Sequence, residues 1–107
     1  MEYQTIRPLE LRSKIEAGEK FRFVDVRELD EYAIARIEGA ELLPLSCFNE
    51  WLGELKPAEE IVFFCHHGVR SGHVCQFLAR MGFEKLYNLE GGIDLWSAEV
   101  DKNVPQY

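Results

Sequence analysis

The sequence predicts an α/β domain in which a small parallel sheet carries helices on both faces. Short apolar or β-branched runs alternate along the chain with stretches whose apolar residues recur at helical spacing. The run Ile61–Phe64 is apolar at every position, as expected of a parallel strand that is covered on both sides. A chain of 107 residues has room for one core of this kind, so we expect a single domain over residues 1–107.

The first half of the chain is expected to contribute three strands and three helices. The strands are predicted at residues 3–6, 21–26 and 42–45. The helices are predicted at residues 8–17, 28–35 and 46–55. Pro8 suits the first turn of a helix, Gly18 suits its end, and Pro44 is expected to stop the third strand. Ser46 is expected to cap the helix that follows, because its hydroxyl can accept a backbone hydrogen bond.

The second half of the chain continues the alternation. Strands are predicted at residues 61–64 and 86–89, and a last helix is predicted to start near residue 93. Between the two strands, Val74 and Leu78 lie at helical spacing, and Gly82 is well placed to end that helix. Residues 101–107 are mostly polar and contain Pro105, so we expect this tail to fray.

Composition and charge argue against several classes of function. The net charge of −7 is unlike that of a nucleic-acid-binding domain, which needs clustered Lys and Arg. The longest apolar run has five residues, whereas a membrane-spanning helix needs about 20, so no membrane association is expected. The first residues lack the features of a signal peptide, which favours the cytoplasm. Three cysteines without a C-x-x-C pair are expected to be free thiols in that compartment.

Cys65 is the residue that points most directly to chemistry. It follows the apolar run of the central strand, and a helical pattern begins after a short loop. Ligands of open α/β folds bind beyond the carboxyl ends of the strands, where Cys65 falls. Backbone N–H groups and the positive end of the helix dipole converge there and favour the thiolate, the reactive form of cysteine. We therefore predict a cysteine nucleophile in a loop that binds anions.

Several motifs, taken in their order and spacing, resemble the rhodanese family in its single-domain form. They are Asp25-Val26-Arg27-Glu28, Glu31-Tyr32, Gly39-Ala40, Pro44-Leu45, Cys65-His66-His67-Gly68-Val69-Arg70-Ser71, Gly82-Phe83 and Tyr87-Asn88-Leu89-Glu90-Gly91-Gly92-Ile93 with Trp96. The resemblance implies a thiosulfate:cyanide sulfurtransferase-like enzyme. Cys65 would take a sulfane sulfur from thiosulfate or another persulfide donor and pass it to cyanide, a small thiol or a protein thiol. Because Cys65 itself carries the sulfur, no cofactor is implied.

The loop after Cys65 is expected to bind the substrate and the persulfide. Its residues are His66, His67, Gly68, Val69, Arg70 and Ser71. Successive amides can form a nest around an anionic sulfur, and Gly68 allows a positive φ. Arg70 is interpreted either as a ligand for the oxyanion end of thiosulfate or as an ion-paired surface residue. His66 and His67 either add positive potential or contribute only their amides.

Two further residues, Asp25 and Arg27, match a family motif near the end of a neighbouring strand. A carboxylate–guanidinium pair at that position would brace the loops around the site, so we expect a structural role. We predict no metal site in the cysteine and histidine cluster around Cys65. A structural zinc site needs four ligands, usually in spaced pairs, and this cluster has no second pair elsewhere.

Two other functions compete with sulfur transfer. A cysteine-based phosphatase or arsenate reductase on the same fold carries five residues between cysteine and arginine, whereas four separate Cys65 from Arg70. A phosphoryl group with three equatorial oxygens needs a wider ring of donors than a terminal sulfur, so the shorter loop favours sulfur. A non-catalytic interaction module is the second alternative, and the intact nucleophile argues against it.

Overall fold

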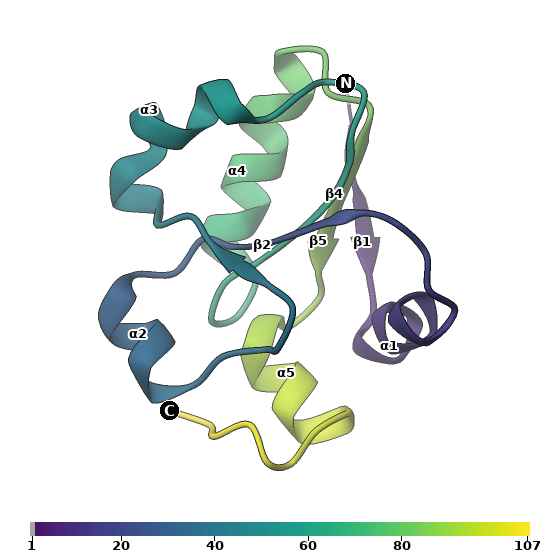
Figure 1. Cartoon of the computed structure of the whole chain (residues 1–107), viewed down its shortest axis with the longest axis vertical. Helices are drawn as coiled ribbons and strands as arrows, with labels where there is room; N and C mark the ends of the chain where they lie inside the picture. The colour runs from purple at the N-terminus through teal and green to yellow at the C-terminus, as the bar shows by residue number, and fades with distance from the viewer. Residues whose placement is uncertain (1) are drawn as a thin grey trace.

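The computed structural model describes residues 2–107 and shows a five-stranded parallel sheet with helices on both faces (Figure 1). The strands are β1 (Gln4–Ile6), β2 (Arg22–Asp25), β3 (Glu41–Leu42), β4 (Glu60–Phe64) and β5 (Lys85–Leu89). They lie in the order β1-β5-β4-β2-β3. The helices are α1 (Pro8–Glu16), α2 (Leu29–Ile34), α3 (Phe48–Trp51), α4 (Val69–Arg80) and α5 (Gly92–Glu99). The predicted α/β class is therefore confirmed.

Strand β4 lies in the middle of the sheet and divides the core into two layers. Ile61 and Phe63 pack in the layer beneath α3 and α4, whereas Val62 and Phe64 pack in the layer beneath α1 and α5. All four side chains are fully buried. Because successive side chains of a strand face opposite sides of the sheet, a strand in this position must be apolar throughout. This requirement explains the unbroken apolar run that precedes Cys65.

The parallel arrangement brings the carboxyl ends of the strands to one edge of the sheet. The segments that follow β2, β4 and β5 all start at this edge and lead into α2, α4 and α5. Figure 1 shows α2, α5 and the end of the chain gathered on the same side of the molecule. The loop that carries Cys65 is therefore surrounded by residues from three other parts of the sequence.

The segment between β3 and β4 differs from its prediction. The helical region is divided into a 3-10 turn, η1 (Leu45–Cys47), then α3, then a second 3-10 turn, η2 (Leu52–Glu54). Ser46 lies inside η1 and does not cap α3, so that prediction is wrong. Its hydroxyl donates to the Glu28 carboxylate at 2.5 Å, and its N–H donates to the same carboxylate at 3.0 Å. A charged acceptor from a distant part of the sequence replaces the local cap.

The tail at residues 101–107 packs against the domain, contrary to the prediction that it frays. Val104 is 8% exposed, and its carbonyl oxygen accepts a hydrogen bond from the Ser97 hydroxyl. Tyr107 reaches α2 and the Cys65 loop through its hydroxyl and its ring. The segment is polar on average, but Val104 and Tyr107 bury apolar surface against the domain. These two contacts hold the tail in place.

The helices within residues 2–107 are too short or too polar to cross a membrane. Cys47, Cys65 and Cys75 are all free thiols. Cys65 and Cys75 are buried, and Cys47 is half-buried. Two of the three thiols are therefore shielded from solvent by the core layer beneath α3 and α4.

Candidate active site

Cys65 lies in the tight loop between β4 and α4, as the sequence predicts. Its Sγ accepts hydrogen bonds from the N–H of Gly68 at 3.1 Å and from the N–H of Ser71 at 3.4 Å. Gly68 has a φ of +102°, which directs its N–H back toward the sulfur and which L side chains rarely adopt. The loop thus forms a backbone nest around Sγ at the amino end of α4, where negative charge is favoured.

Asn88 of β5 fixes the far side of this loop. Its Nδ2 donates to the Gly68 carbonyl oxygen at 3.0 Å, so its Oδ1 faces Ser71. Ser71 Oγ lies 2.6 Å from Asn88 Oδ1 and 3.4 Å from Cys65 Sγ. A hydroxyl carries one hydrogen, and the shorter contact to Asn88 receives it. Ser71 therefore serves the sulfur mainly through its backbone N–H. Asn88 belongs to one of the predicted family motifs, but its role in the loop was not predicted.

The start of α5 supports the Cys65 loop through backbone hydrogen bonds. Ile93 N–H donates to the Cys65 carbonyl oxygen at 2.9 Å, and Asp94 N–H donates to the His66 carbonyl oxygen at 3.1 Å. A Cβ atom at Gly92 would lie 2.4 Å from both of these carbonyl oxygens, closer than real Cβ atoms approach backbone. Only glycine allows α5 to approach the loop this closely. Gly92 is therefore required for α5 to pack against the Cys65 loop.

Arg70 leaves the loop and pairs with Glu31 of α2. The two guanidinium nitrogens Nη1 and Nη2 donate to the two carboxylate oxygens at 2.7 and 2.9 Å. These hydrogen bonds lower the pKa of Glu31 to about 2, and they raise the pKa of Arg70. The structure thus shows the ion-paired alternative for Arg70. Glu31 belongs to one of the predicted family motifs, but its contact with Arg70 was not predicted.

Asp25 and Arg27 form the predicted pair, and both side chains are fully buried. Asp25 accepts two hydrogen bonds from the Arg27 guanidinium, at 2.9 and 2.7 Å, and one from the Arg27 backbone N–H at 2.9 Å. Arg27 also donates to the Ala35 carbonyl oxygen at 2.6 Å. The pair therefore ties the end of β2 to the end of α2. This geometry suits the structural role that the sequence analysis assigned.

Tyr107 connects the tail to the site. Its hydroxyl donates to Glu31 Oε2 at 2.8 Å and accepts from Arg27 Nη1 at 3.0 Å. Its ring stacks on His66 with centroids 3.9 Å apart and an interplanar angle of 8°. Burial raises the pKa of Tyr107, which keeps the hydroxyl protonated as a donor. Sequence reasoning missed this residue, and the only signal was an aromatic side chain in a polar tail.

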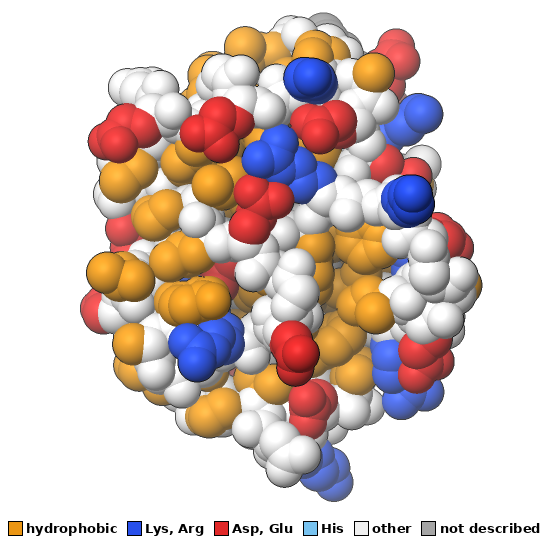
Figure 2. All heavy atoms as spheres, viewed as in Figure 1, with side chains coloured by type: hydrophobic (Ala, Val, Ile, Leu, Met, Phe, Trp, Pro, Cys, Tyr) orange, Lys and Arg blue, Asp and Glu red, His pale blue; other side chains and the backbone are white. Residues whose placement is uncertain are grey.

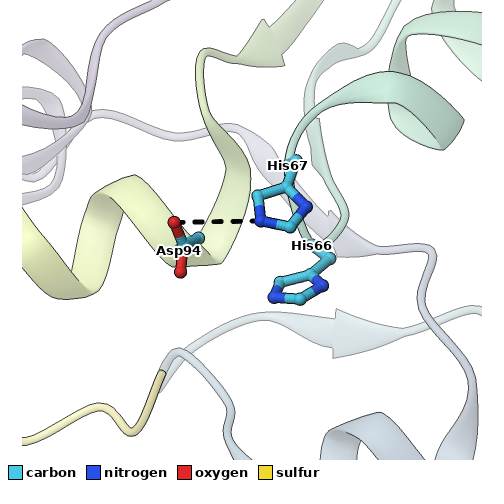
Figure 3. Close-up of side chains that lie close together, drawn as sticks. All are labelled: His66, His67 and Asp94. Carbon is cyan, nitrogen blue, oxygen red and sulfur yellow. Dashed lines mark ion pairs between the residues drawn. The ribbon is translucent and has the colours of Figure 1, made fainter. Parts of the chain in front are cut away.

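His66, His67 and Asp94 lie together at the rim of the loop (Figure 3). Their potential ligand atoms lie within 4.8 Å of one another, and His67 Nε2 is 3.8 Å from Asp94 Oδ2. The two imidazole rings are stacked, with centroids 3.8 Å apart and an interplanar angle of 30°. A histidine binds a metal in the plane of its ring, so stacked rings do not direct their nitrogens toward one ion. The arrangement suits an ion pair between His67 and Asp94 better than metal ligation.

A large cleft lies away from Cys65. It has a volume of about 720 Å³ and is bounded by α1, residues 32–40, Trp96 and residues 101–105. Figure 2 shows this hollow and the apolar side chains within it. None of residues 65–71 lines the cleft. Size alone would place a site there, but the cleft presents no group comparable to the nested thiol, so we locate the chemistry at the Cys65 loop.

We expect the Glu31–Arg70 pair to make stability depend on pH in the acid range. The pKa of Glu31 falls from its ordinary 4.5 to about 2 on folding, so the folded state binds fewer protons. The pair's contribution is therefore complete above pH 4.5 and is lost as the pH falls toward 2. Denaturant unfolding across this window should show wild type losing on the order of 2 kcal/mol more stability than Glu31→Gln. Parallel curves for the two proteins would contradict the assignment.

Comparisons with known proteins cover most of this chain. A protein-family model described as a rhodanese-like domain matches residues 7–99. MoeZ of Mycobacterium tuberculosis, whose name describes an adenylyltransferase/sulfurtransferase, is 35% identical over 105 residues, which are 96% of this chain and 27% of MoeZ. YtwF of Bacillus subtilis is 38% identical over 100 residues, which are 94% of this chain and 96% of YtwF. The structure of the human single domain sulfurtransferase TSTD1 aligns with a TM-score of 0.79 at 28% identity, covering 89% of this chain and 96% of that one.

Proposed function

Since the chain belongs to the rhodanese-like domain family, we propose that it is a sulfurtransferase in which Cys65 carries a sulfane sulfur as a persulfide. The donor is thiosulfate or a persulfide, and the acceptor is cyanide, a small thiol or a protein thiol. The observation that carries this proposal is the nest of N–H donors from Gly68 and Ser71 around Cys65 Sγ. Relatives named as sulfurtransferases support sulfur transfer in general and do not favour a phosphatase.

The proposed reaction has two displacements at sulfur. The Cys65 thiolate attacks the outer sulfur of thiosulfate, a new S–S bond forms, and sulfite leaves with the electron pair of the broken S–S bond. The acceptor then attacks the outer sulfur of the persulfide and returns an electron pair to Cys65 as the thiolate. Cyanide gives thiocyanate in this step, and a thiolate gives a new persulfide. The charge on sulfur is conserved through both steps, so the same nest can serve thiolate and persulfide.

Because Cys65 is buried, only a small terminal atom of a donor, such as a sulfane sulfur, can reach its Sγ. Cys65 is 1% exposed, whereas Val69 at the start of α4 is 65% exposed and His67 projects from the rim. A terminal sulfur at the end of a donor is compact enough to enter such a site, and an acceptor thiol on an extended segment can follow it. We also propose that the chain acts in the cytoplasm, where its three free thiols stay reduced.

Intact mass spectrometry tests this function directly. Incubation with thiosulfate should add one sulfur atom to the wild-type chain, and excess cyanide should remove it as thiocyanate. The matched control is Cys75→Ser, which should gain the same mass, because burial raises the pKa of Cys75 to about 12 and keeps it a thiol. An aryl phosphate serves as the alternative substrate. Robust phosphate release without any sulfur adduct would reject sulfur transfer in favour of a phosphatase.

Replacing Arg70 with alanine should weaken thiosulfate use more than transfer from an alkyl persulfide. The change removes a guanidinium and leaves the Glu31 carboxylate without its partner near the approaching anion. We expect kcat/KM for thiosulfate to fall by about tenfold or more, and that for the persulfide to fall less. Arg12→Ala removes the same charge from an exposed pair on α1 and is the control. An equal loss with both donors would point instead to a structural role for Arg70.

A further inference from the structure

The two arginines beside the Cys65 loop each have an acidic partner. Arg27 is paired with Asp25 at 2.7 Å, Arg70 with Glu31 at 2.7 Å, and His67 Nε2 lies 3.8 Å from Asp94. The positive charges of Arg27 and Arg70 are therefore balanced in the folded protein. A site built to attract a dianion would leave at least one of these cations free to meet it.

Arg70 is the cation whose pairing matters most for a donor. It lies in the first turn of α4, directly after the Cys65 loop. Its side chain is 35% exposed, so an incoming anion can reach it. However, Nη1 and Nη2, which together could bind an oxyanion at two points, both donate to Glu31. A planar guanidinium engaged in a two-point contact cannot offer the same fork to a second anion.

Glu31 is itself fixed by contacts that do not involve Arg70. The Glu28 N–H donates to its Oε1 at 3.1 Å, and the Tyr107 hydroxyl donates to its Oε2 at 2.8 Å. Tyr107 is held in turn by Arg27 and by the stack on His66. The carboxylate side chain is only 17% exposed, so it is screened less by solvent than a surface residue. Glu31 is therefore a preorganised competitor for any anion that approaches Arg70.

We propose that Glu31, held in place by Tyr107, is a positioning residue that keeps Arg70 from binding dianionic donors and thereby matches the site to persulfides that carry a single negative charge. The inference rests on the proposed function and narrows its donor class. The preferred donor carries its sulfane sulfur on an alkyl or peptide body as R–S–S⁻, with one negative charge, and thiosulfate with two is a poorer donor. Glu31 acts through Arg70 and does not touch the reacting sulfur.

The charge of the donor gives a quantitative test. Thiosulfate is a dianion and methanethiosulfonate is a monoanion, and both deliver one sulfur while releasing sulfite or a sulfinate. The energy gained from one freed positive charge scales with the charge of the donor. If Glu31→Gln raises kcat/KM for thiosulfate about tenfold, the rise for methanethiosulfonate should be about threefold, the square root of that value. Both gains should appear mainly in KM and should shrink at high salt.

Three variants make the experiment decisive, each checked for folding by thermal melting. Tyr107→Phe keeps the ring on His66 but removes the hydroxyl, so it should shift donor selectivity in the same direction by a smaller factor. It also tests the inference should Glu31→Gln fold poorly. Asp30→Asn removes a neighbouring charge from α2 that does not contact Arg70, and it should leave the ratio of the two donors nearly unchanged.

The outcomes separate the inference from the function on which it rests. A shift of the donor ratio toward thiosulfate in Glu31→Gln and Tyr107→Phe, absent from Asp30→Asn, supports the inference. An unchanged ratio, or one that moves toward methanethiosulfonate, overturns it while the proposed function stands. No turnover and no sulfur adduct on Cys65 with either donor in wild type would overturn the proposed function, and the inference with it.

Discussion

Replacing Cys65 with serine is expected to lower sulfur transfer by a factor on the order of 10³ or more while leaving the fold intact. A serine hydroxyl at neutral pH is a far weaker nucleophile than a thiolate, and an O–S adduct would not return the sulfur to an acceptor. Serine is smaller than cysteine and can accept the same N–H groups from Gly68 and Ser71. We therefore expect the free energy of unfolding to change by no more than about 1 kcal/mol.

The matched variants for this prediction are Cys47→Ser and Cys75→Ser. Cys47 is half-buried in η1 beside Ser46, and Cys75 is buried in α4. Within residues 2–107 the N–H groups of Gly68 and Ser71 donate to Cys65 Sγ and to neither of the other two sulfurs, so both variants should transfer sulfur at close to the wild-type rate. Thiocyanate formation from thiosulfate and cyanide, measured for all three variants, checks the result. Retained turnover in Cys65→Ser would mean that a different thiol carries the sulfur.

The local parts of the site could be predicted because they follow from short sequence patterns. A strand that is apolar on both faces must be central in a parallel sheet, and a helical pattern just after it places Cys65 at a strand end and a helix start. Gly68 then supplies the positive φ that the nest requires. Each of these steps uses only residues close together in the chain, where spacing determines geometry.

The contacts that set the electrostatics of the site could not be predicted in the same way. Glu31 and Arg70 are 39 positions apart, and Tyr107 lies 76 positions from Glu31. Glu31 also has a local role, since its carboxylate caps α2 through the Glu28 N–H, and that role would explain its identity without Arg70. Ser46 is the opposite case. It was predicted to cap the helix that follows it, but its hydroxyl donates to the distant Glu28 carboxylate instead. Long-range partners of this kind depend on how α2, α4 and the tail pack together.

The second large effect concerns stability. Asp25→Asn should destabilise the protein by about 3–5 kcal/mol, because it leaves the Arg27 guanidinium buried without a counter-charge. The amide keeps the shape of the carboxylate, but its NH₂ group would face a guanidinium nitrogen that now has no acceptor there. Both side chains are fully buried, so water cannot replace the lost contact. A loss of this size is a large part of the total stability of a small domain, and urea unfolding at neutral pH measures it.

The control for Asp25→Asn is Glu16→Gln, which breaks the exposed pair between Arg12 and Glu16 on α1. Those atoms lie 3.9 Å apart and the side chains are 48% and 68% exposed, so the change should cost about 0.5 kcal/mol or less. Each variant replaces one carboxylate with its amide. The difference between their losses in the free energy of unfolding therefore measures the effect of burying the ion pair. If Asp25→Asn costs no more than Glu16→Gln, the guanidinium of Arg27 must find another anion or reach solvent. In that case the pair does not brace the end of β2, and its role beside the Cys65 loop would have to be electrostatic.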